Sequence, residues 1–202
     1  MKIALIGASG QAGLRILAEL TRRGHHVTAI ARNPEKIAAG AHVTAKRGDI
    51  ADTAALAALL KGHDAVISSV RFLDSDPKAL VEAVRASGVK RYFVVGGAAS
   101  LEVAPGVKLI DSPQFPAAYK PEASKGVEFL DFLRNEHELE WTFLSPPAFF
   151  SAGERTGKFR LGKDQLLSNE KGSSISFEDF AIAAVDELEK PKHIRQRFTV
   201  AY

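Results

Sequence analysis

The feature that most constrains the fold of this chain is a glycine-rich loop close to its N-terminus. Residues 2–6 form a short apolar run that reads as a strand, and residues 7–13 follow as Gly-Ala-Ser-Gly-Gln-Ala-Gly. In residues 11–23 the apolar side chains recur at helical spacing, with arginines and a glutamate between them. A strand, a glycine loop and a helix in direct succession are typical of the first βαβ unit of a dinucleotide-binding fold.

Each of the three glycines in this loop has its own expected role. Gly7 permits the tight turn after the strand, Gly10 lets the backbone approach a pyrophosphate, and Gly13 lets the helix pack closely on the strand. The free N–H groups and the positive dipole end of the helix favour the same anion. We expect a bound dinucleotide rather than a glycine-rich turn without a ligand, with contacts from Gly7, Ser9, Gly10, Gln11, Ala12 and Gly13.

The first half of the chain continues to alternate short apolar runs with helix-period segments, which predicts an α/β fold with a parallel sheet. The expected architecture is a Rossmann-type, doubly wound sheet of strand order 3-2-1-4-5-6, extended by a late strand near Phe198 and covered by helices on both faces. Strands are expected at residues 2–6, 26–31, 42–46, 64–69, 91–95, 140–144 and 197–201. Helices are expected at residues 11–23, 53–60, 77–87, 122–136 and 177–188, with a short one starting at Asn33-Pro34.

The second half of the chain is less regular. Residues 96–118 show no clear period and are expected to form a long loop, and residues 151–173 predict loops with one or two short strands. Ser176 followed by Asp179 resembles a capping box before the last helix. We expect a single NAD(P)-binding domain over residues 1–202, with a small C-terminal elaboration on the substrate side whose elements come mainly from residues 96–124 and 146–176.

Composition argues against several other classes of protein. The chain has no cysteine and its six histidines show no metal-ligand spacing, so we expect neither disulfides nor a metal site. The net charge of +3, from 27 basic and 24 acidic residues, is spread along the chain and gives no sign of a nucleic-acid-binding arm. No apolar run reaches the roughly eighteen residues that span a bilayer, and no signal-peptide pattern is present, which favours a cytoplasmic protein without a membrane partner. Nothing in the sequence indicates an oligomeric state.

The end of the second predicted strand indicates which dinucleotide is bound. NAD-binding proteins usually carry a carboxylate there for the ribose hydroxyls, but this chain has Ala31-Arg32-Asn33. The planar guanidinium of Arg32 suits a 2′-phosphate, whereas a solvated arginine at a strand end is the alternative. We therefore expect NADP(H) to be preferred, with NAD(H) as a possible second cofactor.

Further cofactor contacts are expected at the carboxyl ends of the next two strands. Asp49 either accepts a hydrogen bond from the adenine amino group or caps the following turn, and the sequence favours neither. Ser68, Ser69 and Val70 are small enough for contact with a ribose.

Several segments together resemble one family. The glycine loop, Ala-Arg-Asn-Pro-Glu-Lys at residues 31–36, Gly48-Asp49, Val-Gly-Gly-Ala-Ala-Ser at 95–100, Trp-Thr-Phe-Leu-Ser-Pro at 141–146, Ser-Ile-Ser at 174–176 with Asp179, and Arg-Phe-Thr-Val at 197–200 are similar to those of the NADH-flavin reductases. That family belongs to the atypical short-chain dehydrogenase/reductase group, near biliverdin reductase B and the NmrA-like proteins. The resemblance implies that residues 96–100 lie beside the nicotinamide, that Gly96 and Pro146 contact the cofactor, and that Ser100 is an active-site hydroxyl.

One motif of the larger group is missing. Many members carry Tyr-x-x-x-Lys as the proton-donating pair, but here the nearest candidates, Tyr119 and Lys125, are six positions apart and would not share a helix face. We expect a structural or substrate-contact role for both rather than an acid pair. Phe149 and Phe150 follow the Pro146-Pro147 break near the expected ligand mouth, and they either stack on a flat substrate or fill the junction with the C-terminal segment. We favour the second role, because paired phenylalanines usually belong to the core.

These observations favour an NAD(P)H-dependent oxidoreductase that reduces a flavin or a similar planar acceptor, with the flavin as substrate rather than as a tightly bound group. Stacking of nicotinamide and flavin can suffice for hydride transfer, with the proton supplied by water. One alternative is an NmrA-like redox sensor that binds NADP without turnover. Another is a carbonyl reductase of the short-chain dehydrogenase type, which the missing pair disfavours.

Overall fold

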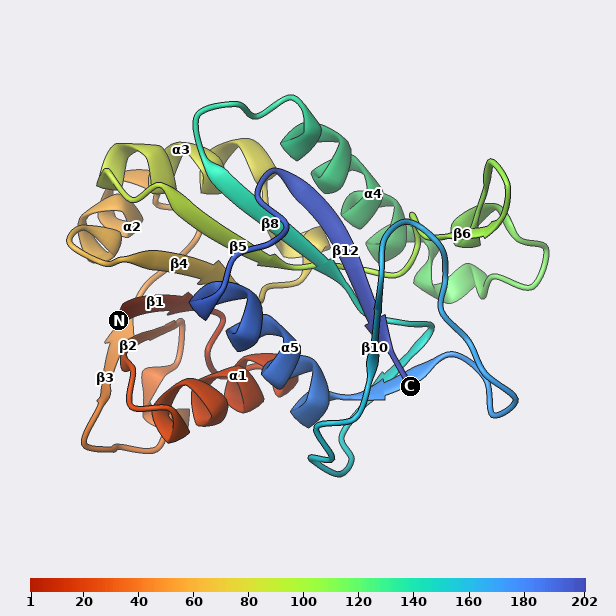
Figure 1. Ribbon diagram of the computed structural model, residues 1–202. Helices are drawn as coiled ribbons and strands as arrows, with labels where there is room; N and C mark the ends of the chain where they lie inside the picture. Colours follow the sequence, from red (N-terminus) through yellow and green to blue (C-terminus); the bar gives the residue numbers. More distant parts are fainter.

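The computed structural model describes all 202 residues and is built around one eight-stranded sheet, in which seven strands are parallel. The sheet order is β10-β12-β8-β5-β4-β1-β2-β3, and the edge strand β10 runs antiparallel to its neighbour β12 (Figure 1). The strands span β1 Lys2–Ile6, β2 His26–Ala31, β3 Val43–Arg47, β4 Ala65–Ser68, β5 Arg91–Val95, β8 Glu140–Ser145, β10 Arg160–Gly162 and β12 Gln196–Ala201. The predicted order 3-2-1-4-5-6 with a late strand is confirmed, whereas the edge strand β10 was not placed in the predicted sheet.

Helices cover both faces of this sheet. They span α1 Gln11–Arg22, α2 Thr53–Leu60, α3 Pro77–Ser87, α4 Lys120–Arg134 and α5 Phe177–Glu189. In Figure 1, α1 and α5 lie side by side below the sheet, and α2, α3 and α4 lie above it. Each face has its own hydrophobic core, so both sides of the parallel strands are buried, as expected for a doubly wound sheet. None of the helices combines the length and the apolarity that a membrane crossing requires.

The helix ends follow the residues that the sequence predicted. The side chain of Asp52 accepts a hydrogen bond from the N–H of Ala55, and Asp76 accepts one from Lys78 in the same way. Gly88 ends α3 with a φ of 82°, a left-handed conformation in which glycine has no steric penalty. The capping box at α5 is only half formed, because Ser176 accepts from the N–H of Asp179 but Asp179 does not return the contact. The Asp179 carboxylate instead accepts hydrogen bonds from the N–H groups of Thr156 and Gly157 and from the hydroxyls of Thr156 and Tyr202.

One prediction of local structure was wrong. Residues 96–118 are not one long loop: β6 (Glu102–Ala104) and β7 (Val107–Lys108) form a small hairpin, which turns at Gly106 with a φ of 75°. Strands of two or three residues are too short to show a hydrophobic period, which is why the pattern did not reveal them. The short helix expected at Asn33-Pro34 is present as a single 3₁₀ turn, Pro34–Lys36.

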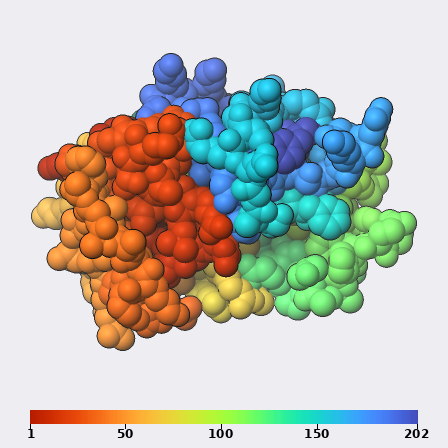
Figure 2. Space-filling model, turned by 90° about the horizontal axis from the view of Figure 1, so that it is seen from below, coloured from red at the N-terminus to blue at the C-terminus, as the bar shows by residue number.

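The two segments predicted to lie on the substrate side are joined by backbone hydrogen bonds. The N–H of Glu102 donates to the carbonyl of Asp164, and the N–H of Leu166 donates to the carbonyl of Glu102, each over 2.8 Å. Within the second segment, β9 (Phe149–Ser151) pairs in parallel with β11 (Ser174–Ser176) as a separate two-stranded sheet. Figure 2 shows a hollow between the red N-terminal segment and the green and cyan segments that carry these elements.

Candidate dinucleotide-binding site

Two of the three loop glycines are required by close packing. The N–H of Gly7 donates to the carbonyl of Ile30 over 2.9 Å, and its φ of 79° is left-handed. A Cβ at Gly7 would lie 2.1 Å from the carbonyl oxygen of Ser69, and a Cβ at Gly13 would lie 2.2 Å from the carbonyl oxygen of Gly7. The loop is therefore fixed between β1, the end of β4 and the first turn of α1, where no side chain fits.

Gly10 lies in a different environment. It is exposed, has extended backbone angles, and the nearest atom to an added Cβ would be the Gly7 carbonyl oxygen at 3.4 Å. The protein supplies no acceptor for the N–H groups of Gln11, Ala12 and Gly13, no side chain caps α1, and its first turn holds no acidic residue. Free N–H groups at a helix N-terminus, with open space beside Gly10, fit a pyrophosphate.

The side chains around this helix end are partly occupied. Ser9 is half-buried and its hydroxyl makes no hydrogen bond within the protein. The side-chain oxygen of Gln11 accepts a hydrogen bond from Arg15 over 3.2 Å, and Arg15 also pairs with Glu178 at 3.0 Å. Gln11 and Ala12 therefore offer mainly their backbone N–H groups to a ligand, while Arg15 holds α1 against the start of α5.

Arg32 lies two residues beyond Ile30, whose carbonyl accepts hydrogen bonds from the glycine loop. It is exposed and forms no ion pair or hydrogen bond with any other residue. Because no carboxylate competes for its guanidinium, Arg32 can contact the 2′-phosphate of a cofactor whose pyrophosphate lies at α1.

The residues after β3 and β4 only partly fit the predicted contacts. Asp49 is exposed, and one of its carboxylate oxygens accepts a hydrogen bond from the N–H of Ala51 over 3.0 Å, so it caps the turn; its contact with adenine stays a prediction. Ser68 is 1% exposed and its hydroxyl lies 2.9 Å from that of Tyr92 in the core, so the predicted ribose contact through this hydroxyl is wrong. Ser69 and Val70 are half-buried beside the glycine loop and remain available.

The loop after β5 is held tightly in place. An added Cβ at Gly96 would lie 2.3 Å from the Phe143 ring and 2.8 Å from the Leu144 carbonyl oxygen, so packing against β8 already requires a glycine here. Pro146, directly after β8, is buried. Ser100 is also buried, and its hydroxyl accepts a hydrogen bond from Arg197 over 3.2 Å. This placement gives Ser100 a structural contact, and its role as an active-site hydroxyl stays a prediction.

Arg197 was not predicted from the sequence, yet it joins three parts of the site. Its guanidinium donates to Asp164 over 2.6 and 2.9 Å, to the Ser100 hydroxyl over 3.2 Å and to the Ser145 hydroxyl over 3.4 Å. Only 4% of the Arg197 side chain is exposed, against 51% for Asp164. Arg197 therefore ties the loop after β5 and the end of β8 to the substrate-side segment.

Glu122, in the first turn of α4, was also missed. Its carboxylate accepts hydrogen bonds from the N–H groups of Phe72 (2.7 Å) and Leu73 (2.9 Å), at the start of a 3₁₀ turn that follows β4. The ring of Phe72 packs against Gly126, where an added Cβ would lie 3.0 Å away. These contacts fix the loop after β4 against α4.

Tyr119 and Lys125 form no hydrogen bond with each other, in agreement with the expectation that they are not an acid pair. Tyr119 is 67% exposed and its hydroxyl makes no hydrogen bond, while Lys125 pairs with Glu128 at 2.6 Å.

The two phenylalanines after β8, Phe149 and Phe150, differ in role. Phe150 packs against Phe177 and Phe180, with ring centroids 4.5 and 4.7 Å apart, whereas Phe149 is 71% exposed. The slight preference for two core rings was right for Phe150 and wrong for Phe149.

Comparison with known proteins agrees with this geometry. Residues 7–191 match the family described as NAD(P)H-binding, a stretch that includes the glycine loop, all five α-helices and the strands from β2 to β11. The chain belongs to the NAD(P)H-binding family.

Solved structures of this NAD(P)H-binding protein's relatives share its fold over the whole chain. A "putative exported protein" from Burkholderia pseudomallei is 48% identical, with a TM-score of 0.91, and the match covers 100% of both chains. A "putative epimerase" from Bacteroides thetaiotaomicron is 43% identical, with a TM-score of 0.94, and covers 100% of this chain and 96% of its own. A "putative NADH-flavin reductase" from Streptococcus pneumoniae is 37% identical, with a TM-score of 0.81, and covers 100% and 99%. These descriptions agree on the architecture and differ on the reaction.

Proposed function

We propose that this protein is an NADPH-dependent oxidoreductase that reduces a flavin or a similar planar acceptor. The observation that carries the proposal is the first turn of α1, where unpaired N–H groups and the open position at Gly10 coincide with the free guanidinium of Arg32. The description of the Streptococcus relative supports a flavin as the acceptor. The separation of Tyr119 from Lys125 disfavours the carbonyl-reductase alternative, which needs a positioned proton donor.

The roles of the residues follow from their positions. The α1 N-terminus binds the pyrophosphate, Arg32 binds the 2′-phosphate, and the loop that begins at Gly96 borders the nicotinamide. The bound cofactor supplies the hydride. Phe149 presents an exposed ring on the substrate-side segment, where it can stack on a flat acceptor, and solvent water supplies the proton.

The cofactor part of the proposal is tested by affinity. A charge-assisted contact from Arg32 of roughly 1.5–3 kcal/mol corresponds to about a ten- to hundredfold preference for NADPH over NADH. Arg32→Ala should remove most of that preference and leave NADH affinity nearly unchanged. Lys61→Ala, which removes an exposed cation after α2, is the matched control. Equal affinities of the native protein for the two cofactors would reject the assignment of Arg32.

The acceptor part is tested by NADPH oxidation with FMN, FAD and a quinone. Phe149→Ala should raise the KM for the acceptor by about tenfold, because it removes one stacking ring, without changing NADPH affinity. Leu161→Ala removes another exposed apolar side chain, from the edge strand β10, and should leave this KM unchanged. Tight NADPH binding without oxidation by any acceptor would favour the redox sensor instead.

The proposal includes a cytoplasmic location, where reduced nicotinamide cofactors are produced. The Burkholderia relative is described as exported, so fractionation of cells that express the native protein is a direct check. Recovery of the protein outside the cytoplasm would contradict this part.

A further inference from the structure

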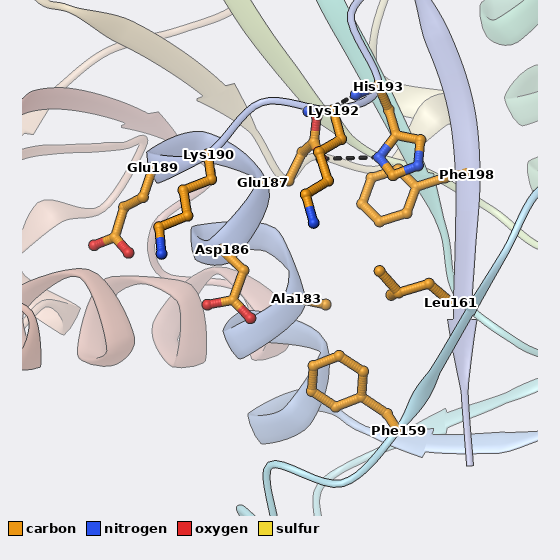
Figure 3. A pocket seen from close by; sticks show the side chains of 10 residues that line it. All are labelled: Phe159, Leu161, Ala183, Asp186, Glu187, Glu189, Lys190, Lys192, His193 and Phe198. Atoms are coloured by element: carbon orange, nitrogen blue, oxygen red, sulfur yellow. Dashed lines mark hydrogen bonds and ion pairs between the residues drawn. The ribbon is translucent and has the colours of Figure 1, made fainter.

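A second pocket lies away from the glycine loop, between α5, β12 and the edge strand β10. Its volume is about 300 Å³ and Figure 3 shows the side chains that line it. It is near the C-terminal end of α5, where Glu189 bonds to His25 and His25 bonds to the N-terminus. This end of α5 faces the amino-terminal edge of the sheet, whereas the dinucleotide site is at the carboxyl-terminal edge. The two sites are therefore separate.

One wall of this pocket is apolar. It is formed by Phe159 and Leu161 from the β10 side, Ala183 from α5 and Phe198 from β12. Leu161 is 51% exposed, so part of this wall is open to solvent. An apolar wall of this size with a few polar groups is typical of small-molecule sites.

A buried carboxylate fixes the histidine that lines the pocket. Glu187 accepts a hydrogen bond from Nδ1 of His193 over 2.8 Å, and its other oxygen accepts from the N–H groups of Lys192 (3.0 Å) and His193 (2.8 Å). Arg91 lies 3.5 Å behind the same carboxylate. The imidazole also stacks on Phe198, with centroids 4.1 Å apart and an angle of 5° between the planes. The ring is thereby oriented, and its Nε2 has no partner in the protein.

The charges around the pocket are not balanced once existing pairs are considered. Asp186 and Glu189 each pair with Arg23 at 2.8 Å, and Glu187 is occupied by His193 and Arg91. Lys190 and Lys192 form no ion pair, and in Figure 3 the Lys192 side chain points into the space between α5 and β12. The groups left to meet an anionic ligand are the two ammonium groups.

We propose that this pocket binds a small carboxylate whose body is flat and apolar. The body packs against Phe159, Leu161 and Phe198, and the carboxylate meets the ammonium group of Lys192. This site would be independent of the proposed reductase activity, because no residue of the dinucleotide site lines it.

The experiment is an NMR titration of the NADPH-saturated protein with 1-naphthoate and with its neutral analogue 1-naphthamide. Saturation with NADPH occupies the dinucleotide site. Naphthoate should shift the amide signals of residues 159–161, 183 and 193 and should bind about tenfold more tightly than the amide, since only the carboxylate meets the free cations. Equal affinities, or no shifts at these amides, would overturn the proposal.

Two variants separate this site from the acceptor site. Lys192→Met, at an exposed position, should weaken naphthoate binding about three- to tenfold and leave naphthamide binding unchanged. The matched control Lys61→Met should have no effect, and neither should Phe149→Ala. Loss of binding in Phe149→Ala or no loss in Lys192→Met would each contradict the proposal.

Discussion

Gly10 and Gly13 are three residues apart in one glycine motif, yet alanine should mainly weaken NADPH binding at Gly10 and mainly destabilise the fold at Gly13. Alanine at Gly13 places a Cβ 2.2 Å from the Gly7 carbonyl oxygen, inside the helix–strand contact. In an ordinary helix position the same change would stabilise the protein by about 0.8–1 kcal/mol. Here we expect it to destabilise the fold by several times that amount, because backbone rather than a flexible side chain must move.

Alanine at Gly10 meets no such obstacle. The nearest atom is 3.4 Å away, and the backbone angles of −75° and 166° suit any residue. Since alanine is a poorer N-terminal cap than glycine, we expect a loss of less than about 1 kcal/mol in the free energy of unfolding. The added methyl group projects into the space where the pyrophosphate approaches the free N–H groups. Loss of one charge-assisted hydrogen bond, roughly 1.5–3 kcal/mol, should weaken NADPH binding by about ten- to hundredfold.

Denaturant unfolding gives the stability of both variants, and calorimetric titration of the folded Gly10→Ala protein gives its NADPH affinity. Gly24→Ala, at an exposed glycine with no atom within 4 Å of an added Cβ but a φ of 78°, is the control for backbone strain alone. It should lose some stability and bind NADPH normally. Native affinity in Gly10→Ala, or native stability in Gly13→Ala, would refute this account of the loop.

Three other predictions test the surroundings of the site. Tyr119→Phe and Lys125→Met should each lower flavin reduction less than about tenfold, because neither residue is placed as a proton donor; a loss of about 10²–10⁴ in either would contradict this. Arg197→Met should lower the free energy of unfolding by about 2–4 kcal/mol, because it leaves buried polar partners unpaired, whereas Arg134→Met, at an exposed pair with Asp131, should cost less than about 1 kcal/mol; equal losses on denaturation would refute the difference. Burial alone would raise the pKa of Glu19, but hydrogen bonds from Arg22, Arg155 and Arg23 hold it far below its ordinary value. The stabilisation from Glu19 should therefore be complete above an ordinary glutamate pKa of about 4.3 and be lost as the pH falls below it; unfolding measured from neutral to acidic pH should show a shallower decline in Glu19→Gln, and parallel declines would contradict this.

The order of the parallel strands was predictable because the elements that build the sheet leave a signal in the sequence. Apolar residues recur at helical spacing in the five α-helices, and most of the seven parallel strands are short apolar runs. The glycine stops at Gly24, Gly62 and Gly88 were equally predictable, since each adopts a positive φ just after a helix. The hairpin β6–β7 and the edge strand β10 were not, because two or three residues cannot display a period.

The site was predictable where a motif places the backbone and unpredictable where side-chain direction decides. Ser68 ends β4 with its hydroxyl on Tyr92 in the core, and strand alternation alone, without the register, does not reveal which face it takes. Arg197 reads as a charged residue in a late strand, but its partner Ser100 is 97 positions away in the chain. Glu122 reads as an acidic residue in a first helical turn, whereas its carboxylate bonds to a loop 50 positions earlier. Contacts at such separations follow from the tertiary fold and leave no local signal.

The most direct test of the proposed function is an anaerobic single-turnover reaction of the protein–NADPH complex with FMN. Loss of NADPH and reduction of the flavin should proceed together in equal amounts, and NADPH deuterated at the transferred position should slow both signals to the same extent. NADPH that remains bound and unoxidised while the flavin stays oxidised would contradict the account. Transfer of deuterium from NADPH to a carbonyl substrate, at a rate that falls sharply in Tyr119→Phe, would also contradict the account.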